Sequence, residues 1–350
     1  MKNKWMPLLF IAATGILLSG CSKETAKESK IYDKSDIAMG TVITERIYTQ
    51  GEDKTSEIIE LLSEIEHRYL SWREEDSDIG KINQQAGKGQ APVDDQTMGY
   101  LEESLRIAEE SQGAFDPTIG ELSVLWDVEA ENPKVPSKKK IRQCLQNSGY
   151  EKIRMGSDGG QDWVELEDQC SIDLGAVGKG IGCDETARLL KEDDQVQGAV
   201  IAVGGSILTL GSKPDETSWK VAVRDPRGEQ EDLLGVLDLE GENYVSTSGD
   251  YEKYFMQDGK RYHHILDPST GHPADTGLIS VTVLGENGLV SDGLSTACFV
   301  LGMEKGAKLL ESYQAEGIFV NEEKQVYVTE GLMENFELVA SGYIVFPLSS

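Results

Sequence analysis

Basic residues, histidine and cysteine are all scarce in this 350-residue sequence, and each shortage excludes a class of protein. Lysine and arginine number 33 against 62 aspartates and glutamates, so the formal charge is −29. Nucleic acid repels such a chain and is excluded as a partner, although solubility alone explains most of the surface acids. The five cysteines form no CxxC pair and are spaced irregularly, so neither a disulfide framework nor a cysteine zinc site is indicated.

A hydrophobic run long enough to span a membrane is missing from the N-terminus. The apolar run at residues 6–18 follows two lysines and is well short of the ~20 residues that a spanning helix needs, so we interpret residues 1–20 as a signal peptide. The leader ends in LLSGC, which is similar to the lipobox of bacterial lipoproteins. Lipidation of Cys21 by acyl chains such as palmitate would anchor the protein to the extracytoplasmic face of the cell membrane. The alternative is an ordinary cleaved leader with a chance cysteine.

The rest of the chain divides into a short tether and one large domain. Residues 21–35 begin with the lipidated cysteine and continue in polar residues with few apolar anchors, so we predict a flexible, dispensable tether. Residues 36–345 contain no linker rich in proline, glycine or serine and no internal repeat. They are therefore predicted to form a single domain.

Hydrophobic periodicity indicates the α+β class. Helical spacing is found at residues 55–70, 97–112, from about 182, and 287–302, and Gly113 is placed to end the second helix. Strand patterns occur at 199–205, 219–225, 235–240, 243–249, 261–267 and 278–285, and two more short strands close the chain. Helices beside hairpin-connected strands, without regular βαβ alternation, predict mixed or antiparallel sheets flanked by helices.

A glycine-rich segment, DLGAVGKGIG at residues 173–182, is suited to a phosphorylated ligand. Its glycines allow a close backbone approach, the N–H groups of the following helix can bind phosphate oxygens, and Lys179 adds a positive charge. The segment is not a Walker loop, because Asp173 stands where glycine is required and Gly180 where serine or threonine is required. A plain tight turn is the alternative.

The segment SDGLSTA at residues 291–297 offers oxygen ligands from a predicted helix. Asp292 and Thr296 are four residues apart and so project from one face, where a carboxylate and a hydroxyl suit a hard cation such as magnesium. The alternative is a capping aspartate next to a threonine that bonds its own backbone. Two further segments, GAFDPTIG at 113–120 and AMGTVITERIY at 38–48, are each more typical of turns or core than of a ligand site.

Taken in order, nine segments resemble the ApbE family of FAD:protein FMN transferases, which are typically lipoproteins. The segments are MGT, LSWREEDSDIGKIN, GAFDPT, DLGAVGKGIGCDE, VGGS, VAVRDP, VSTSGDYEKYF, HHILDPSTGHP and SDGLSTA, and the resemblance covers roughly residues 35–345. It implies a magnesium-dependent transfer of FMN from FAD to a threonine hydroxyl of a partner flavoprotein, with release of AMP. The acceptor would be a protein such as a membrane redox-complex subunit or an extracytoplasmic flavoprotein.

The resemblance also assigns site residues. The carbonyl of Ala176 with Asp292 and Thr296 would hold the metal, and His264 would be the catalytic residue. The implied FAD contacts are Met39, Trp72, Ala114, Phe115, Asp116, Asp173, Lys179 and Ile265. Two positions depart from the family pattern: Trp72 replaces the usual tyrosine and loses its hydroxyl, which affects FAD affinity, and Gly178 replaces a commoner alanine.

Three of the four histidines fall within HHILDPSTGHP, residues 263–273, which raises the question of a zinc site. Strand alternation sends His263 and His264 to opposite faces, which is a poor arrangement for one ion. One imidazole suffices as the base that accepts the proton of an attacking hydroxyl. We therefore expect His264 to act in catalysis and His263 and His272 to be structural.

Two alternative functions use the same residues differently. Water in place of threonine would make the protein an FAD pyrophosphatase that yields FMN and AMP. A non-catalytic flavin-binding lipoprotein would keep the FAD contacts but need neither His264 nor the Asp292–Thr296 pair, whose presence argues against it.

Overall fold

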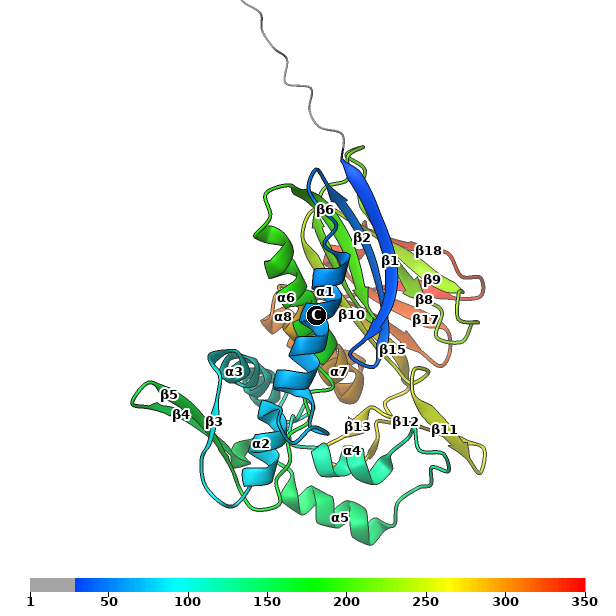
Figure 1. Cartoon of the computed structure of the whole chain (residues 1–350). Coiled ribbons are helices and arrows are strands. Elements are labelled where there is room, and N and C mark those ends of the chain that lie inside the picture. The colour runs from blue at the N-terminus through cyan, green and yellow to red at the C-terminus, as the bar shows by residue number, and fades with distance from the viewer. Residues whose placement is uncertain (1–28, 350) are drawn as a thin grey trace, which may run out of the picture.

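A nine-stranded sheet organises the protein (Figure 1), seen here in a computed structural model that describes residues 29–349. Its order is β1-β2-β6-β7-β10-β15-β16-β17-β19, and all neighbours are antiparallel except β17 and β19. The strands are β1 Lys30–Ala38, β2 Thr41–Thr49, β6 Val196–Val203, β7 Ser206–Gly211, β10 Asn243–Gly249, β15 Leu278–Gly285, β16 Glu316–Asn321, β17 Gln325–Thr329 and β19 Ile344–Leu348.

Smaller sheets complete the strand content. One is β18 (Phe336–Leu338), β9 (Leu233–Leu239) and β8 (Trp219–Arg224), and another is β3 (Ala91–Val93), β5 (Gln161–Leu166) and β4 (Ile153–Asp158). Two hairpins follow one another: β11 (Tyr254–Gln257) with β12 (Lys260–His263), and β13 (Leu266–Asp267) with β14 (His272–Pro273).

Helices α1, α6, α7 and α8 contact one face of the nine-stranded sheet, and the β8–β9–β18 sheet lies against the other, while α2, α4 and α5 lie away from it (Figure 1). The helices are α1 Thr55–Glu64, α2 Asp78–Gln85, α3 Asp95–Glu110, α4 Gly120–Trp126, α5 Lys138–Asn147, α6 Gly178–Lys191, α7 Gly288–Leu301 and α8 Met303–Ser312, with a π-helix at Ile65–Leu70 and 3-10 turns at Tyr150–Lys152 and Glu330–Leu332. The α+β prediction is confirmed. Among residues 29–349, no helix is both long and apolar enough to cross a membrane.

The helical periodicities are confirmed with shifted ends. The first predicted helix is α1 followed by the π-helix, the second is α3, the third is α6, and the fourth is α7. Helix α6 begins at Gly178, four residues before the predicted start. At the end of α3, Gly113 adopts φ +80° and its N–H reaches the Ala108 carbonyl, as expected of a glycine that ends a helix.

The structure corrects one predicted strand and the predicted end of the tether. Residues 261–267 are not one strand, because β12 ends at His263 and His264 lies in a bend before β13. Residues 30–35, assigned to the tether, form the start of β1, whose nine residues all pair with β2. Charged side chains on an edge strand obscured its pattern, since β1 alternates between exposed and half-buried positions. The domain therefore starts at Lys30, and the leader and Cys21 lie outside the described residues.

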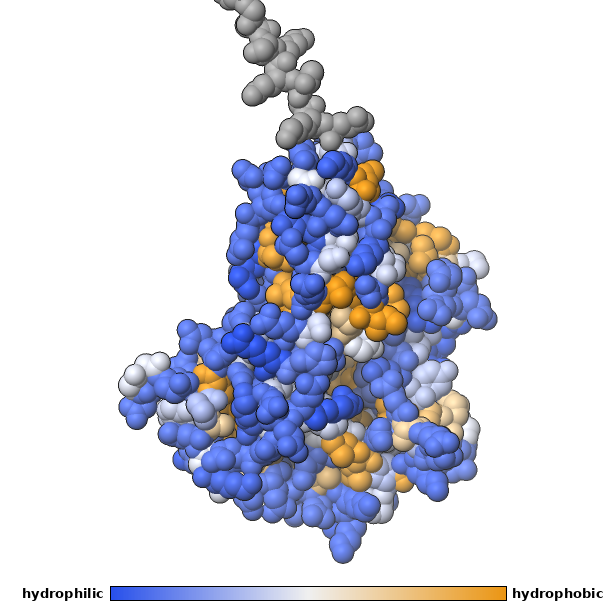
Figure 2. All heavy atoms as spheres, viewed as in Figure 1, coloured by the Kyte–Doolittle hydropathy of each residue, from blue (hydrophilic) through white to orange (hydrophobic). Residues whose placement is uncertain are grey.

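Between the part that carries the nine-stranded sheet and the part that carries α2, α4 and α5, the surface is hollowed, with apolar side chains at its margin (Figure 2). The hairpin of β1 and β2 ends toward this region in Figure 1, and the segment between β12 and β13 lies across from it. The site residues described next come from these surrounding elements.

Candidate active site

Helices α6 and α7 cross at their first turns and cap one another. Asp292 of α7 accepts a hydrogen bond from the Gly180 N–H of α6 at 3.0 Å. In return, Asp184 of α6 accepts the N–H groups of Gly288 and Leu289 at the start of α7, at 2.6 and 2.9 Å. The helices approach so closely that a Cβ on Gly180 would lie 2.1 Å from the Gly288 carbonyl oxygen. Helix α6 thus receives its side-chain cap from α7, while α7 is capped by its own Asn287 and additionally by Asp184 of α6.

Lys179 lies beside this crossing and next to a hairpin turn. The turn joins β6 to β7 at Gly204 and Gly205, where Gly204 has φ +57°. A Cβ on Gly205 would come within 3.8 Å of Lys179 Nζ, and one on Gly204 within 3.3 Å of Lys179 Cδ. Gly204 is the position that requires glycine, because its φ is positive and a Cβ would lie 2.6 Å from Thr41 Oγ1, whereas a Cβ on Gly205 would make only an ordinary contact with Lys179.

Met39 occupies a second turn at the same end of the sheet. Ala38 pairs with Thr41, so Met39 and Gly40 form a two-residue turn, and Met39 has φ +51°. Its side chain packs against two groups of buried apolar residues. One lies between α1, α6 and the strands β2, β6 and β7, and the other, the larger core, includes residues of α3 and α7. A Cβ on Gly182 would lie 3.0 Å from Met39 Sδ. Met39 is therefore in contact with the first turns of the helix that carries Lys179.

The GAFDPT segment and the start of the glycine-rich segment lie side by side. The Asp173 N–H donates to the Pro117 carbonyl at 2.8 Å, and the Asp173 carboxylate accepts the Gly175 N–H at 2.8 Å. Asp116 is 8% exposed and accepts from the Thr118 N–H and hydroxyl and from the Tyr150 N–H. Burial raises the Asp116 pKa, which these donors oppose. Ala114 and Phe115 are buried beside it.

Two of the proposed metal ligands, Asp292 and Thr296, lie on α7, and the third, Ala176, lies just before the start of α6. Asp292 is 3% exposed, and burial raises its pKa, while the positive charge of Lys179 acts in the opposite direction. The Gly180 N–H is a first-turn donor with no partner inside α6 and bonds Asp292, and the Ala176 carbonyl lies just before the N-cap of this helix. Thr296 lies one turn beyond Asp292 and is half-buried. A carboxylate, a carbonyl and a hydroxyl are ligands that fit magnesium.

Zinc would need a different set of ligands. Residues 29–349 contain no group of three or more histidine, cysteine, aspartate or glutamate side chains arranged to hold a metal. His263 is 6% exposed, bonds the Ala274 carbonyl through Nε2 at 3.0 Å, and packs edge-on against Phe299. His272 packs edge-on against Trp126. Both rings thus have packing roles in this part of the fold.

His264 differs from its neighbour because its side chain is exposed to solvent. The bend after β12 is held by the His264 N–H, which donates to the Lys253 carbonyl at 3.1 Å, and Nδ1 lies 3.3 Å from the same oxygen. Crowding by the surrounding protein and then the charge of Lys179 lower the His264 pKa, so the ring is neutral at pH 7. Ile265, the next residue, is 5% exposed.

Trp72 follows the π-helix and has an existing stacking partner. The Arg73 guanidinium lies 4.1 Å from the centre of the Trp72 ring. The indole is half-buried against the larger core. π-Helices are frequent at functional sites, and this one ends two residues before Trp72. No hydrogen bond between described residues joins Trp72 to His264 or Asp292.

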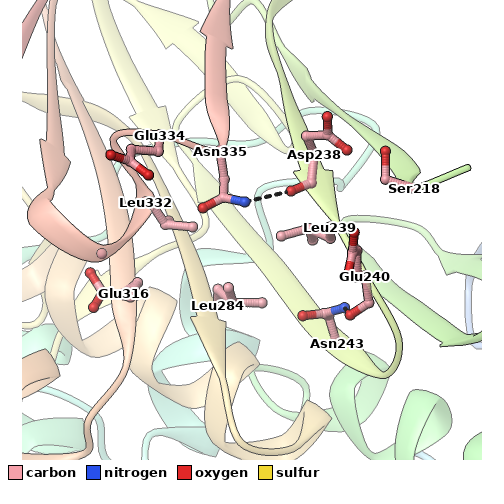
Figure 3. Close-up of a pocket in the computed structure, with 11 residues that line it drawn as sticks. Ser218, Asp238, Leu239, Glu240, Asn243, Leu284, Glu316, Leu332, Glu334 and Asn335 are labelled. Atoms are coloured by element: carbon pink, nitrogen blue, oxygen red, sulfur yellow. Dashed lines mark hydrogen bonds between the residues drawn. The ribbon is translucent and has the colours of Figure 1, made fainter.

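The candidate site does not coincide with the cavity drawn in Figure 3. A cavity of about 470 Å³ lies elsewhere, lined by β9, β10 and the segment before β18 (Figure 3). Its lining includes the carboxylates of Asp238, Glu240, Glu316 and Glu334, and Asn335 bonds the Asp238 carbonyl at 2.8 Å. None of the proposed FAD, metal or catalytic residues lines this cavity, so it is not the candidate site.

Sequence reasoning gave no roles to three residues that support the site. Asp184 caps α7, Ser206 acts to lower the pKa of the Asp292 carboxylate, and Ser248 on β10 bonds hydroxyls of α7. The sequence carried a signal for each, since they fall in the GCDE, VGGS and VSTSGD segments. Only the fold shows which partners they meet.

The fold is α+β, and the candidate site combines the glycine-rich start of a helix, which is suited to phosphate, with oxygen atoms that are suited to a cation. The ApbE family model matches residues 39–319, and the chain belongs to the ApbE family. A relative from Treponema pallidum, named FAD:protein FMN transferase, is 31% identical over 332 residues, covering 90% of this chain and 91% of the relative. A relative of the same name from Vibrio cholerae is 32% identical, with 90% and 92% covered.

Solved structures agree with the sequence relatives. The ApbE protein from Thermotoga maritima is 33% identical with a TM-score of 0.78, covering 87% of this chain and 99% of that one. The flavinyl transferase ApbE from Pseudomonas stutzeri, in its apo form, is 30% identical with a TM-score of 0.76, covering 89% and 99%. The similarity therefore extends over nearly the whole described domain.

Proposed function

We propose that this protein is an FAD:protein FMN transferase, which moves FMN from FAD to a threonine hydroxyl of an acceptor flavoprotein. Lys179 carries this proposal, because it directly precedes Gly180, whose N–H bonds Asp292 at 3.0 Å, and its charge also lowers the pKa of His264. A base, a cation and a metal-binding carboxylate within reach of one another are what transfer of a phosphoryl group requires. The relatives named FAD:protein FMN transferase match most of the chain.

The reaction breaks the pyrophosphate of FAD. The threonine oxygen forms a bond to the phosphorus of the FMN half, the bond to the bridging oxygen breaks, and AMP leaves with that oxygen. The neutral His264 imidazole accepts the threonine proton. Lys179 and the free N–H groups at the start of α6 hold the phosphate oxygens.

Magnesium fits the proposed site and would neutralise charge on the pyrophosphate. Asp292, Thr296 and the Ala176 carbonyl are the residues that would hold it. The Asp292 carboxylate is already oriented by the Gly180 N–H, so little reorganisation is needed when a cation binds. The remaining places on the ion would go to substrate phosphates and water.

The flavin nucleotide would lie along the hollow between the two parts of the molecule. Residues from five separate segments would contact it: Met39, Trp72, Ala114, Phe115, Asp116, Asp173 and Ile265, with Lys179 on the phosphates. Trp72 would stack on a ring face, and Arg73 must then leave that face or the ligand must take the other one.

One assay separates the three functions. The purified domain is incubated with FAD, magnesium and candidate acceptors from the same organism, and the acceptor mass and AMP are followed. The transferase adds the mass of FMN to the acceptor and releases one AMP for each transfer. AMP and free FMN without acceptor labelling would identify a pyrophosphatase, whereas FAD binding without AMP would identify a flavin-binding protein. Either result contradicts the proposal.

We further propose that Cys21 anchors the protein by lipid to the extracytoplasmic face of the cell membrane. The support is the short apolar leader and the LLSGC segment. Its acceptors are then a membrane redox-complex subunit or an extracytoplasmic flavoprotein. Labelling cells with a palmitate analogue tests the anchor: the parent should incorporate label and Cys21→Ala should not, and equal labelling would refute it.

A further inference from the structure

Ser248 of β10 forms a chain of hydroxyl groups with helix α7. Ser248 Oγ lies 2.7 Å from Ser295 Oγ and 3.2 Å from Thr296 Oγ1. Ser295 Oγ in turn lies 2.8 Å from the Asp292 carbonyl oxygen. The strand thus reaches the helix turn that bears two of the proposed metal ligands.

Counting protons fixes the direction of this chain. A carbonyl oxygen can only accept, so Ser295 must donate its single hydroxyl proton to Asp292. Ser295 therefore accepts from Ser248 at 2.7 Å, which uses the only proton that Ser248 has. The contact at 3.2 Å can then be made only if Thr296 donates to Ser248.

This direction matters for a threonine that binds a cation. A hydroxyl ligand must present a lone pair to the ion and place its proton elsewhere. A threonine in a helix commonly gives that proton to a backbone carbonyl of the preceding turn. Here Ser295 already bonds the Asp292 carbonyl, and Ser248 offers an acceptor instead.

We propose that Ser248 is a positioning residue, which accepts the Thr296 hydroxyl proton and so holds the Thr296 oxygen lone pairs toward magnesium. This inference rests on the proposed function, because it concerns the same metal site. Ser248 does not touch the ion. It acts through Thr296, as outer hydrogen-bonding partners orient the ligands of other metal sites.

The test measures magnesium affinity directly, without reference to flavin transfer. Isothermal titration calorimetry with Mg²⁺ is run on the FAD-loaded protein for the parent, Ser248→Ala and Ser248→Thr. We expect Ser248→Ala to weaken magnesium binding by about 10- to 100-fold, the usual cost of losing an outer partner. Ser248→Thr keeps the hydroxyl and should restore most of the affinity.

A hydroxyl removed elsewhere in the sheet is the matched control. Thr209 is fully buried on β7 and donates to the Gly241 carbonyl at 3.0 Å, and no hydrogen bond of the described residues joins it to α7. Thr209→Val should cost stability but leave the magnesium affinity unchanged. Circular dichroism melts show whether each variant is folded.

The outcomes separate this inference from the function. Equal magnesium affinity in the parent and Ser248→Ala would overturn the role of Ser248, whatever the transfer assay shows. Equal weakening in Ser248→Thr would also overturn it, because the hydroxyl would then not be the active feature. A parent that binds magnesium and FAD but labels no acceptor would refute the proposed transferase while leaving the Ser248 comparison valid. A parent that binds no magnesium would overturn both the magnesium dependence and this inference.

Discussion

At the scale of single residues, the two adjacent histidines should separate chemistry from packing. His264 is exposed and neutral, so His264→Ala should still bind FAD but transfer FMN at least about 100-fold more slowly, the usual effect of losing a positioned base. His263 is buried against Phe299, and His263→Ala should lower the melting temperature and keep most of the rate. Single-turnover AMP release with thermal melts measures both. Equal rate losses in the two variants would contradict the assignment.

Glu45 should make stability depend on pH. It is 1% exposed, neither carboxylate oxygen has a hydrogen-bond partner among the described residues, and burial raises its pKa from 4.5 to about 7. The folded protein therefore binds this proton more tightly than the unfolded chain. Its stabilising contribution is complete below pH 4.5 and is lost as the pH rises through 7.

Removing this titration is the test. Glu45→Gln keeps the shape without the charge and should stabilise the protein at pH 8 by on the order of 2 kcal/mol, with the difference disappearing near pH 4. Glu60→Gln, at an exposed position of α1, should leave the stability within about 0.5 kcal/mol of the parent. Denaturant unfolding at several pH values measures the effect. A Glu45→Gln variant that is less stable than the parent at pH 8 would refute the unpaired-charge interpretation.

At the scale of elements, the crossing of α6 and α7 should have no room for even one added methyl group. A Cβ on Gly180 would lie 2.1 Å from the Gly288 carbonyl oxygen, which is backbone and cannot swing away. Gly180→Ala is expected to destabilise the protein by about 3 kcal/mol and to weaken FAD binding. Gly99 in α3 has nothing within 4 Å of its Cβ position, so Gly99→Ala should stabilise by about 0.5–1 kcal/mol. Similar melting temperatures for the two variants would contradict the close crossing.

The N-terminal boundary gives a second prediction about an element. A chain that starts at Lys30 keeps all of β1, whereas one that starts at Asp36 loses six of its nine residues and the Asp33–Arg46 ion pair. We expect the first to match the full mature protein in melting temperature and the second to melt several degrees lower, since the β2 edge is uncovered. Equal stability of the two truncated proteins would restore the longer tether that the sequence suggested.

For the whole molecule, the sequence predicted the family and the fold class better than the strand boundaries. The glycine-rich segment and the Asp292–Thr296 pair were recognisable because each carries its own local pattern. Helix α6 was predicted to start late, because Gly178, Gly180 and Gly182 disfavour a helix. Asp292, which is more than 100 positions away, supplies the missing cap, and no local pattern records that contact.

The bend at His264 was missed for a related reason. Alternation through YHHIL predicts a continuous strand. In the structure, however, the Lys253 carbonyl accepts a hydrogen bond from the His264 N–H and also lies within 3.3 Å of His264 Nδ1. That carbonyl belongs to the segment just before β11, so the hairpin itself ends the strand. The opposite error occurred at edge strand β1, where a polar composition predicted a flexible tether. Pairing with β2 outweighs that composition.

The mutual capping of α6 and α7 has a consequence for how the molecule opens. Asp292 of α7 caps α6, and Asp184 of α6 adds to the cap that Asn287 gives α7, so each helix loses hydrogen bonds if the other leaves and the two should unfold as one cooperative unit. In native-state hydrogen exchange, the amides of Gly180, Gly288 and Leu289 should then share one opening free energy. Asp184→Asn should speed exchange at Gly180 as well as at the amides that it contacts. The Gly80 amide, capped within its own helix by Ser77, should exchange as before.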